Sequence, residues 1–169
     1  MIIEIINLDK SIKFNFRKNI EELLKFVPQE DLYKINKITI IDYPVERNVK
    51  DAAGLYYGYQ NAKNIEIVLN VSGMFYKMPR IFFIIFPIIP KLLLATTLFH
   101  EIGHHVQRIG HGYKKEGWEK TAEQYSKEIT KKVFLTSRLF KALKLFKFLL
   151  VPILKFYKIK NRKNSVRTR

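Results

Sequence analysis

Short runs of β-branched residues alternate with polar segments in the N-terminal part of the chain. Ile2 to Ile6 and Ile35 to Tyr43 are rich in isoleucine, and this composition predicts two β-strands. Leu55 to Tyr59 and Ile65 to Leu69 flank residues 60 to 64, which are mostly polar, and this arrangement predicts a β-hairpin. The pattern therefore predicts a small sheet that is partly antiparallel.

Helical signals separate and follow these strands. Asn19, with Glu22 after it, is typical of a helix N-cap, and Pro28 is expected to end the short helix that begins there. A longer helix is predicted from about Pro90 to Ile109, because proline is favoured at the first helical position and Gly110 provides a stop signal. Helices and strands mixed in this way predict the α+β class.

Ile81 to Pro90 is an apolar run without charge, and its apolar character continues into the predicted long helix. A membrane-spanning helix needs about 20 uninterrupted apolar residues. Pro87, Pro90 and Lys91 interrupt the run well before that length. We therefore expect a buried strand or loop that leads into a core helix, with a membrane span as the alternative.

The predicted long helix contains the motif His100-Glu101-Ile102-Gly103-His104. Histidines at this spacing lie on one helical face, where both imidazoles can reach one metal ion, and Glu101 borders the same site. Catalytic zinc sites combine three protein ligands, one open position and a nearby carboxylate that accepts a proton. We therefore predict that His100 and His104 bind zinc and that Glu101 is the general base. The alternative is that both histidines are solvated on a polar helix face. The apolar residues just before the motif argue against it, because they indicate a buried position in which imidazoles need partners.

A second helix is predicted from Trp118 to about Thr136. Its first turns match a family pattern through Glu119, Ala122, Glu123, Tyr125 and Ser126. Together with the histidine motif, this pattern resembles the gluzincin metallopeptidases, especially the minigluzincins, the CAAX prenyl protease group and the small bacterial regulatory metallopeptidases. The resemblance covers about Leu92 to Ser126. It implies that Glu119 is the third zinc ligand. The strand Ile65 to Leu69 resembles the edge strand that pairs with an extended substrate in zincins.

Helical spacing supports this arrangement independently of the resemblance. Ala122 and Ser126 lie on the same helical face as Glu119, and their small side chains would let this helix approach Gly103 closely. Glu123 is predicted to accept a hydrogen bond from a ligand imidazole, that of the first motif histidine. The alternative is that both carboxylates are solvated charges on a surface helix.

Other side chains near the motif leave alternatives open. His111 is an alternative third ligand, although the metzincin spacing, with Gly at 107 and His at 110, is not met. His105 points away from the metal face and is predicted to be a surface residue or to support the site. The families also use a Tyr or His to stabilise the oxyanion, and Tyr113, His111 and Tyr76 are the candidates.

Composition adds limits on chemistry and location. The chain has 169 residues and no cysteine, so a metal ion must be bound by His, Asp or Glu. No secretory signal follows Met1, so a cytoplasmic location is expected. The formal net charge is +16, and residues 137–169 contribute eleven basic and no acidic residues to it. A block of one sign indicates an interaction segment for an anionic partner.

The basic segment also carries a helical pattern. Lys141, Lys144 and Lys147 recur at every third position, and apolar residues gather on the opposite side of the helical wheel. Basic amphipathic helices of this type lie at anionic membrane interfaces. Packing against the catalytic domain or a second copy, and binding to nucleic acid, are the alternatives. Pro152 is expected to kink or end this helix.

We therefore predict an α+β, zincin-like domain over residues 1–136 and a basic amphipathic tail over residues 137–169. The predicted function is a zinc metallopeptidase that acts on a peptide or protein substrate. The alternative is a non-enzymatic protein that binds membrane or nucleic acid and has a structural zinc site, which would normally have a fourth protein ligand. The predicted location is the cytoplasm, with peripheral contact at a membrane surface.

Overall fold

A computed structural model describes residues 1–9, 12–42, 52–58, 64–75, 78–79, 81–111 and 117–136. The chain divides into two compact units, Met1–Val133 and Phe134–Arg169. Of the second unit only residues 134–136 are described. The predicted amphipathic helix of the tail therefore lies outside the described residues.

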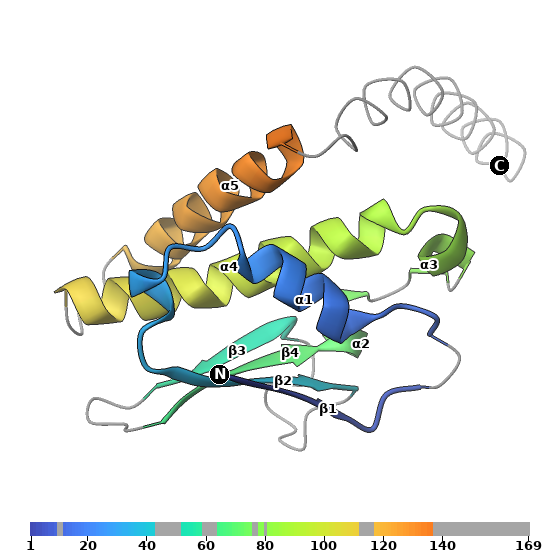
Figure 1. Cartoon of the computed structure of the whole chain (residues 1–169), viewed down its shortest axis with the longest axis horizontal. Coiled ribbons are helices and arrows are strands. Elements are labelled where there is room, and N and C mark those ends of the chain that lie inside the picture. The colour runs from blue at the N-terminus through green and yellow to red at the C-terminus, as the bar shows by residue number, and fades with distance from the viewer. Residues whose placement is uncertain are drawn as a thin grey trace, which may run out of the picture. The chain divides into compact units, whose positions relative to one another are not determined.

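A mixed sheet forms one layer of the first unit (Figure 1). Its strands are β1 (Ile2–Ile6), β2 (Ile35–Ile41), β3 (Gly54–Tyr57) and β4 (Ile65–Asn70), in the spatial order β1-β2-β4-β3. β1 and β4 each pair with β2 in parallel, whereas β3 pairs with β4 in antiparallel orientation. The predicted partly antiparallel sheet is confirmed.

The helices lie on one side of this sheet (Figure 1). They are α1 (Phe16–Leu24), the short 3₁₀ helix η1 (Glu30–Leu32), α2 (Val71–Met74), α3 (Ile81–Ile85), α4 (Ile88–His111) and α5 (Trp118–Thr136). α4 lies across the sheet beside α1 (Figure 1). Alternate strand residues such as Ile38 and Ile67 are fully buried, as are Leu94 and Leu98 of α4. The core therefore lies between the sheet and α4, and the α+β class is confirmed.

β4 does not lie at the edge of this sheet. The prediction that the strand Ile65 to Leu69 is an edge strand is therefore wrong, because β4 pairs with β2 on one side and with β3 on the other. Its residues are mostly buried, as expected of a central strand. The edge strand beside α4 is β3.

The first helix begins earlier than the sequence pattern predicts. The N-cap is Asn15, whose side-chain oxygen accepts a hydrogen bond of 2.9 Å from the backbone N–H of Lys18. Asn19 lies inside the helix and its side-chain amide donates to the backbone carbonyl of Asn15. The helix also ends at Leu24, well before Pro28. Both asparagines are good N-caps, and burial of Phe16 favours the earlier one.

The long helix extends beyond both predicted ends. It begins at Ile88 and places Pro90 inside its first turn, where backbone N–H groups have no intrahelical partner and proline is tolerated. It continues through Gly110 to His111, so Gly110 does not stop it. The apolar run before it forms the short helix α3 and not a strand or loop. Within the described residues, no helix combines the length and the apolar content that crossing a membrane requires.

Candidate metal centre

His100, His104 and Glu119 direct their side-chain ligand atoms towards one point. His100 Nε2 and His104 Nε2 are 3.1 Å apart. Glu119 Oε2 lies 3.3 Å from His100 Nε2, and Glu119 Oε1 lies 3.6 Å from His104 Nε2. These residues form a group that could hold a metal ion.

The separations between ligand atoms fit a small tetrahedral ion. For ligands at 2.0–2.1 Å from zinc, the edges of the tetrahedron are roughly 3.3 Å long. The imidazole nitrogens are 3.1 Å apart, and the two carboxylate oxygens of Glu119 lie 3.3 and 3.6 Å from one imidazole nitrogen each, so these separations are close to this length. One ligand atom from each of the three side chains lies within 4.8 Å of the others, and the group could therefore hold one ion.

α4 provides the two imidazoles from a well-anchored stretch of helix. Leu98 and Phe99 directly precede the motif, Ile102 lies within it, and all three are completely buried. This packing fixes the helix rotation, so His100 and His104 lie on the face that is turned away from the core. The two rings are nearly perpendicular, with centroids 4.6 Å apart. Their Nε2 atoms consequently approach each other at the helix surface.

α5 brings Glu119 to this surface because the two helices approach closely. A methyl group on Gly103 would lie only 2.8 Å from the Cα atom of Ala122. Further along, the Ser126 hydroxyl donates a hydrogen bond of 2.8 Å to the backbone carbonyl of Thr96. Gly103 thus contacts Ala122, whereas Thr96, which comes earlier in α4, contacts Ser126, which comes later in α5. The two helices are therefore antiparallel. The predicted close approach of Ala122 and Ser126 to the motif helix is confirmed.

Glu101 lies on the other side of the motif, beneath the edge strand. Its side chain is buried, and a methyl group on Gly54 of β3 would lie 2.6 Å from Glu101 Oε1. Burial raises the pKa of Glu101 to about 8, and the nearby negative charge of Glu119 contributes to the same shift. Without a cation nearby, Glu101 therefore carries a proton at neutral pH.

The imidazole of His104 is held in its neutral form. Its side chain is 12% exposed, whereas that of Glu119 is 82% exposed. Burial lowers the pKa of His104, and the neighbouring His100 lowers it further, although Glu119 acts in the opposite direction. Neutral imidazole is the form that binds metal ions. The centre therefore combines a buried ligand on α4 with a ligand on α5 that faces solvent.

Glu123 does not make the predicted hydrogen bond to an imidazole. Its carboxylate forms an ion pair with Lys127, with 2.6 Å between Oε1 and Nζ, and both side chains are exposed. This pair lowers the pKa of Glu123. Nδ1 of His104 is buried and has no hydrogen-bond partner among the residues that the structure describes. The usual acceptor behind a ligating histidine is therefore not supplied by Glu123.

His105 has a structural role that the sequence pattern did not specify. It points away from the metal face, as predicted, but it is completely buried. Its Nδ1 accepts a hydrogen bond of 3.0 Å from the Tyr56 hydroxyl, and its Nε2–H donates one of 2.7 Å to the Tyr33 carbonyl. Burial is the main cause that lowers the pKa of His105. His105 thus connects α4 to β3 and to the segment after η1.

Two of the residues that support the site were not identified from the sequence. Gly54 permits the contact between β3 and Glu101, and Tyr56 binds His105. A glycine within a strand pattern signals close backbone approach, but Gly54 lies just before the predicted strand Leu55 to Tyr59 and carried no such signal. Tyr56 carried none either. The oxyanion candidates Tyr76 and Tyr113 lie outside the described residues, as does the side chain of His111, so their predicted roles stay predictions.

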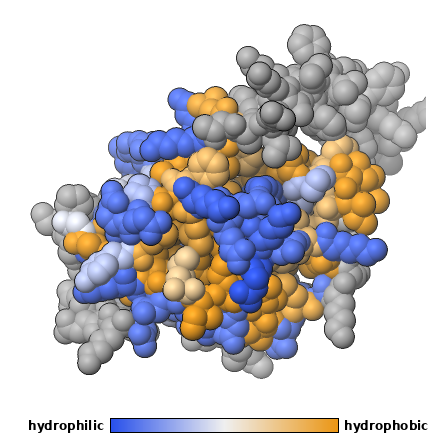
Figure 2. Space-filling model, viewed as in Figure 1, coloured by the Kyte–Doolittle hydropathy of each residue, from blue (hydrophilic) through white to orange (hydrophobic). Residues whose placement is uncertain are grey.

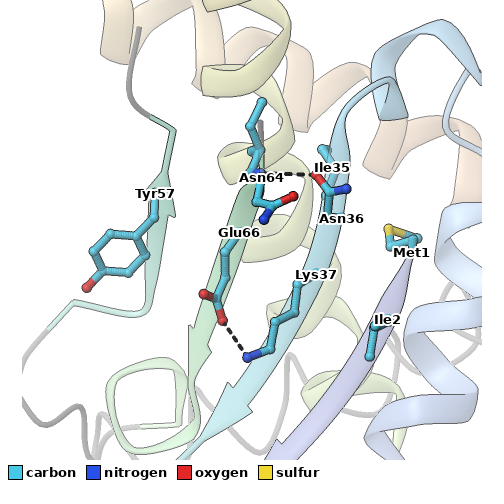
Figure 3. Close-up of a pocket in the computed structure, with 9 residues that line it drawn as sticks. Met1, Ile2, Ile35, Asn36, Lys37, Tyr57, Asn64 and Glu66 are labelled. Atoms are coloured by element: carbon cyan, nitrogen blue, oxygen red, sulfur yellow. Dashed lines mark hydrogen bonds and ion pairs between the residues drawn. The ribbon is translucent and has the colours of Figure 1, made fainter. Parts of the chain in front are cut away.

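A hollow of about 790 Å³ is lined by residues of the four strands and by neighbouring residues (Figure 3). It is lined in part by Met1, Tyr57 and Asn64. Lys37 lies between two carboxylates there, 2.6 Å from Glu4 Oε2 and 3.3 Å from Glu66 Oε1. The single positive charge of Lys37 is thus paired with two carboxylates, and the hollow contains none of the candidate metal-centre residues. The group that could hold a metal ion is the cluster on α4 and α5.

Comparison with known proteins gives no assignment. No family model matches the chain, and neither a curated protein nor a solved structure matches it.

Proposed function

We propose that this chain is a zinc-dependent metallopeptidase with a zincin-like, gluzincin-type centre. The observation that carries the proposal is the convergence of His100, His104 and Glu119 at separations that suit a tetrahedral ion. Glu101, the adjacent buried carboxyl group, is the proposed general base. The resemblance of the motif and of the second helix to gluzincins supports the same assignment.

The donor set favours zinc over other common ions. Two imidazoles and one carboxylate are a ligand set of catalytic zinc sites, whereas calcium and magnesium prefer oxygen ligands. When bound, zinc supplies an acidified water molecule and polarises a carbonyl group. Glu119 is largely exposed, so the side of the centre next to it is open to solvent and to a substrate. Catalytic sites need such an open position.

Glu101 is suited to move a proton. Its carboxyl group is buried beside the ligand imidazoles, where burial raises its pKa to about 8. A divalent cation at the imidazoles would favour the ionised form and lower this pKa. Glu101 could then accept a proton from the attacking water and pass it to the leaving amine. Gly54 keeps the carboxyl group in place from the side of β3.

β3 supports a peptide as the substrate class. It is an edge strand of the described sheet and it packs against α4 beside Glu101. An extended peptide can add to such an edge through main-chain hydrogen bonds. The edge-strand role that the resemblance implied for Ile65 to Leu69 thus passes to β3 in this proposal. A substrate on β3 would lie next to the metal centre.

The alternative is a non-enzymatic protein with a structural zinc site. Structural sites usually have four protein ligands. The metal-binding group in the described part of the chain has three members, and one of them is largely exposed. This composition favours the catalytic proposal over the structural one.

Metal analysis and a peptide-library cleavage assay of the full-length protein test the proposal. We expect stoichiometric zinc, and we expect cleavage that a chelator abolishes and added zinc restores. Glu101→Gln should retain zinc and lose hydrolysis, because the amide forms hydrogen bonds but does not take up the proton. His100→Ala or His104→Ala should lose zinc, because two ligands bind the ion weakly.

Three results would contradict parts of this proposal. Zinc content like that of the wild type in either histidine variant would refute the site. Cleavage by Glu101→Gln at the wild-type rate would refute the role of Glu101. Zinc binding without hydrolysis of any library peptide would favour the structural alternative.

A further inference from the structure

α3 turns three isoleucines towards solvent. Ile81, Ile84 and Ile85 are 50%, 61% and 57% exposed, respectively. Their spacing places them on one side of the helix, and we call these three residues the α3 face. Figure 2 shows hydrophobic surface over this end of the unit. Leu92, one of the first residues of α4, is also partly exposed and extends the apolar character.

The α3 face is fixed outward by packing on the opposite side of the helix. Phe83 is buried, and its ring centroid lies 4.9 Å from that of Phe75 and 6.0 Å from that of Phe14. Both contacts have nearly perpendicular ring planes, which is a favoured aromatic geometry. Rotation of α3 to bury its isoleucines would remove Phe83 from this cluster. The exposure of the α3 face is therefore a consequence of stable packing.

The charge of the surrounding sequence is of one sign. Residues 67–100 contain Lys77, Arg80 and Lys91 and no acidic residue. Lys91 forms an ion pair with Glu22, with 2.5 Å between Nζ and Oε2. Lys77 and Arg80 precede the α3 face directly in the sequence. Apolar residues next to basic ones are typical of segments that insert into the headgroup region of anionic membranes.

We propose that the α3 face binds an anionic lipid surface. The isoleucines would enter the boundary between headgroups and acyl chains, and the excess of positive charge in the surrounding sequence would favour an anionic surface over a neutral one. Association of two copies through this face is less favourable, because each chain carries a net charge of +16 and the copies repel each other. An anionic surface attracts the same charge. This inference does not depend on the proposed peptidase activity.

The α3 face lies before the start of α4, whereas the two histidines of the metal centre lie in the second half of α4. The twelve steps from Ile88 to His100 span roughly 18 Å along a helix of 1.5 Å rise per residue. Binding of lipid at α3 therefore leaves the metal centre accessible. Substitutions in the α3 face should leave zinc content unchanged, and this content serves as a test of correct folding.

Sedimentation of the full-length protein with vesicles tests the proposal. The variant is Ile84→Gln/Ile85→Gln, and the matched control is Ile5→Gln/Ile109→Gln, which changes isoleucines that are 41% and 50% exposed elsewhere. With vesicles of phosphatidylglycerol and phosphatidylcholine, we expect the variant to bind roughly tenfold more weakly or worse, because apolar insertion is lost. The control should bind like the wild type. Vesicles of phosphatidylcholine alone should bind the wild type much less.

Several results would overturn the inference. Binding of the α3 variant at the wild-type level would show that another segment, such as residues 137–169, is the sole lipid contact. Equal losses in the variant and the control would indicate a non-specific effect of lost surface hydrophobicity. A wild-type dimer that the α3 variant alone converts to a monomer, in analytical ultracentrifugation, would identify a second copy as the occupant. Absence of wild-type binding to either vesicle type would also refute it.

Discussion

Glu101 and Glu119 are two carboxylates of one centre in different surroundings. Glu101 is buried under β3, and burial with the added charge of Glu119 raises its pKa to about 8. Glu119 is mostly exposed, and its oxygens lie within 3.6 Å of a ligand imidazole. Some enzymes place one carboxylate in a buried environment and a second one in an exposed environment. The two groups then take different roles, one in acid–base chemistry and the other in electrostatic stabilisation. The surroundings of these residues thus match the proposed roles.

The raised pKa of Glu101 predicts a pH-dependent stability of the metal-free protein. A neutral carboxyl group contributes stability that is fully present below the ordinary pKa of 4.5 and is lost as pH rises towards about 8. Glu101→Gln removes this loss of stability at high pH, because the amide does not ionise. Urea unfolding of chelator-treated proteins should therefore show that the variant gains stability relative to wild type between pH 5 and pH 8, by on the order of a few kcal/mol. A difference that does not change with pH would contradict the buried, protonated state.

The two glutamates of α5 should differ strongly in their effect on zinc affinity. Glu119→Ala removes a ligand and should weaken affinity severely. Glu123→Ala should stay within about threefold of wild type, because its carboxylate is exposed and paired with Lys127. Competition titration with a zinc-binding dye measures both. His111→Ala is expected to change affinity little, and a loss there as large as that of Glu119→Ala would refute the assignment of the third ligand.

Single residues of the site were predictable where chemistry depends on local spacing. His100 and His104 follow from helical periodicity, which places both on one face. Glu119 was reached through the family resemblance. The error on Glu123 has a local cause, because Lys127 lies one turn later and competes for its carboxylate. Gly54 and Tyr56 depend on the position of β3 over α4, which local patterns do not determine.

At the scale of elements, the approach of α5 to α4 places Glu119, and Gly103 permits this approach. Gly103→Ala should force the helices apart, because the neighbouring atoms belong to the backbone of Ala122 and do not rotate away. We expect at least tenfold weaker zinc binding although all three ligands remain, and a loss of stability of about 1–3 kcal/mol. Zinc titration and urea unfolding measure these effects.

Gly110→Ala is the matched control for this substitution. It changes another glycine of the same helix, and nothing lies within 4 Å of the added methyl group. Alanine is favoured over glycine in helices, so this variant should be unchanged or more stable by up to about 1 kcal/mol. Zinc affinity like that of the wild type in Gly103→Ala, or an equal loss in Gly110→Ala, would refute the role of close packing in positioning Glu119.

Elements were predicted most accurately where the pattern is long and regular. α5 follows the predicted range, whereas α4 extends past both Pro90 and Gly110, where the local signals had placed its ends. The start of α1 was wrong because Asn15 and Asn19 carry the same capping signal. The order of the strands depends on long-range pairing, and so the edge position of β3 could not be derived from local sequence.

At the scale of the whole molecule, residues 137–169 and the α3 face should contribute differently to membrane binding. The eleven basic residues of the tail attract anionic headgroups, and salt screens this attraction. The isoleucines of the α3 face contribute an apolar interaction, which moderate salt does not weaken. The two contributions can therefore be separated by a salt series.

Deletion of residues 137–169 should leave zinc content intact and should greatly reduce affinity for anionic vesicles, mainly at low salt. The binding that remains should depend less on salt than that of the wild type, because the isoleucines of the α3 face provide its apolar part. Conversely, Ile84→Gln/Ile85→Gln in the full-length protein should leave binding that high salt abolishes. Unchanged vesicle affinity after the deletion, or loss of zinc and of folded structure, would instead favour packing of the tail against residues 1–136, because a lipid-binding tail is not required for the fold.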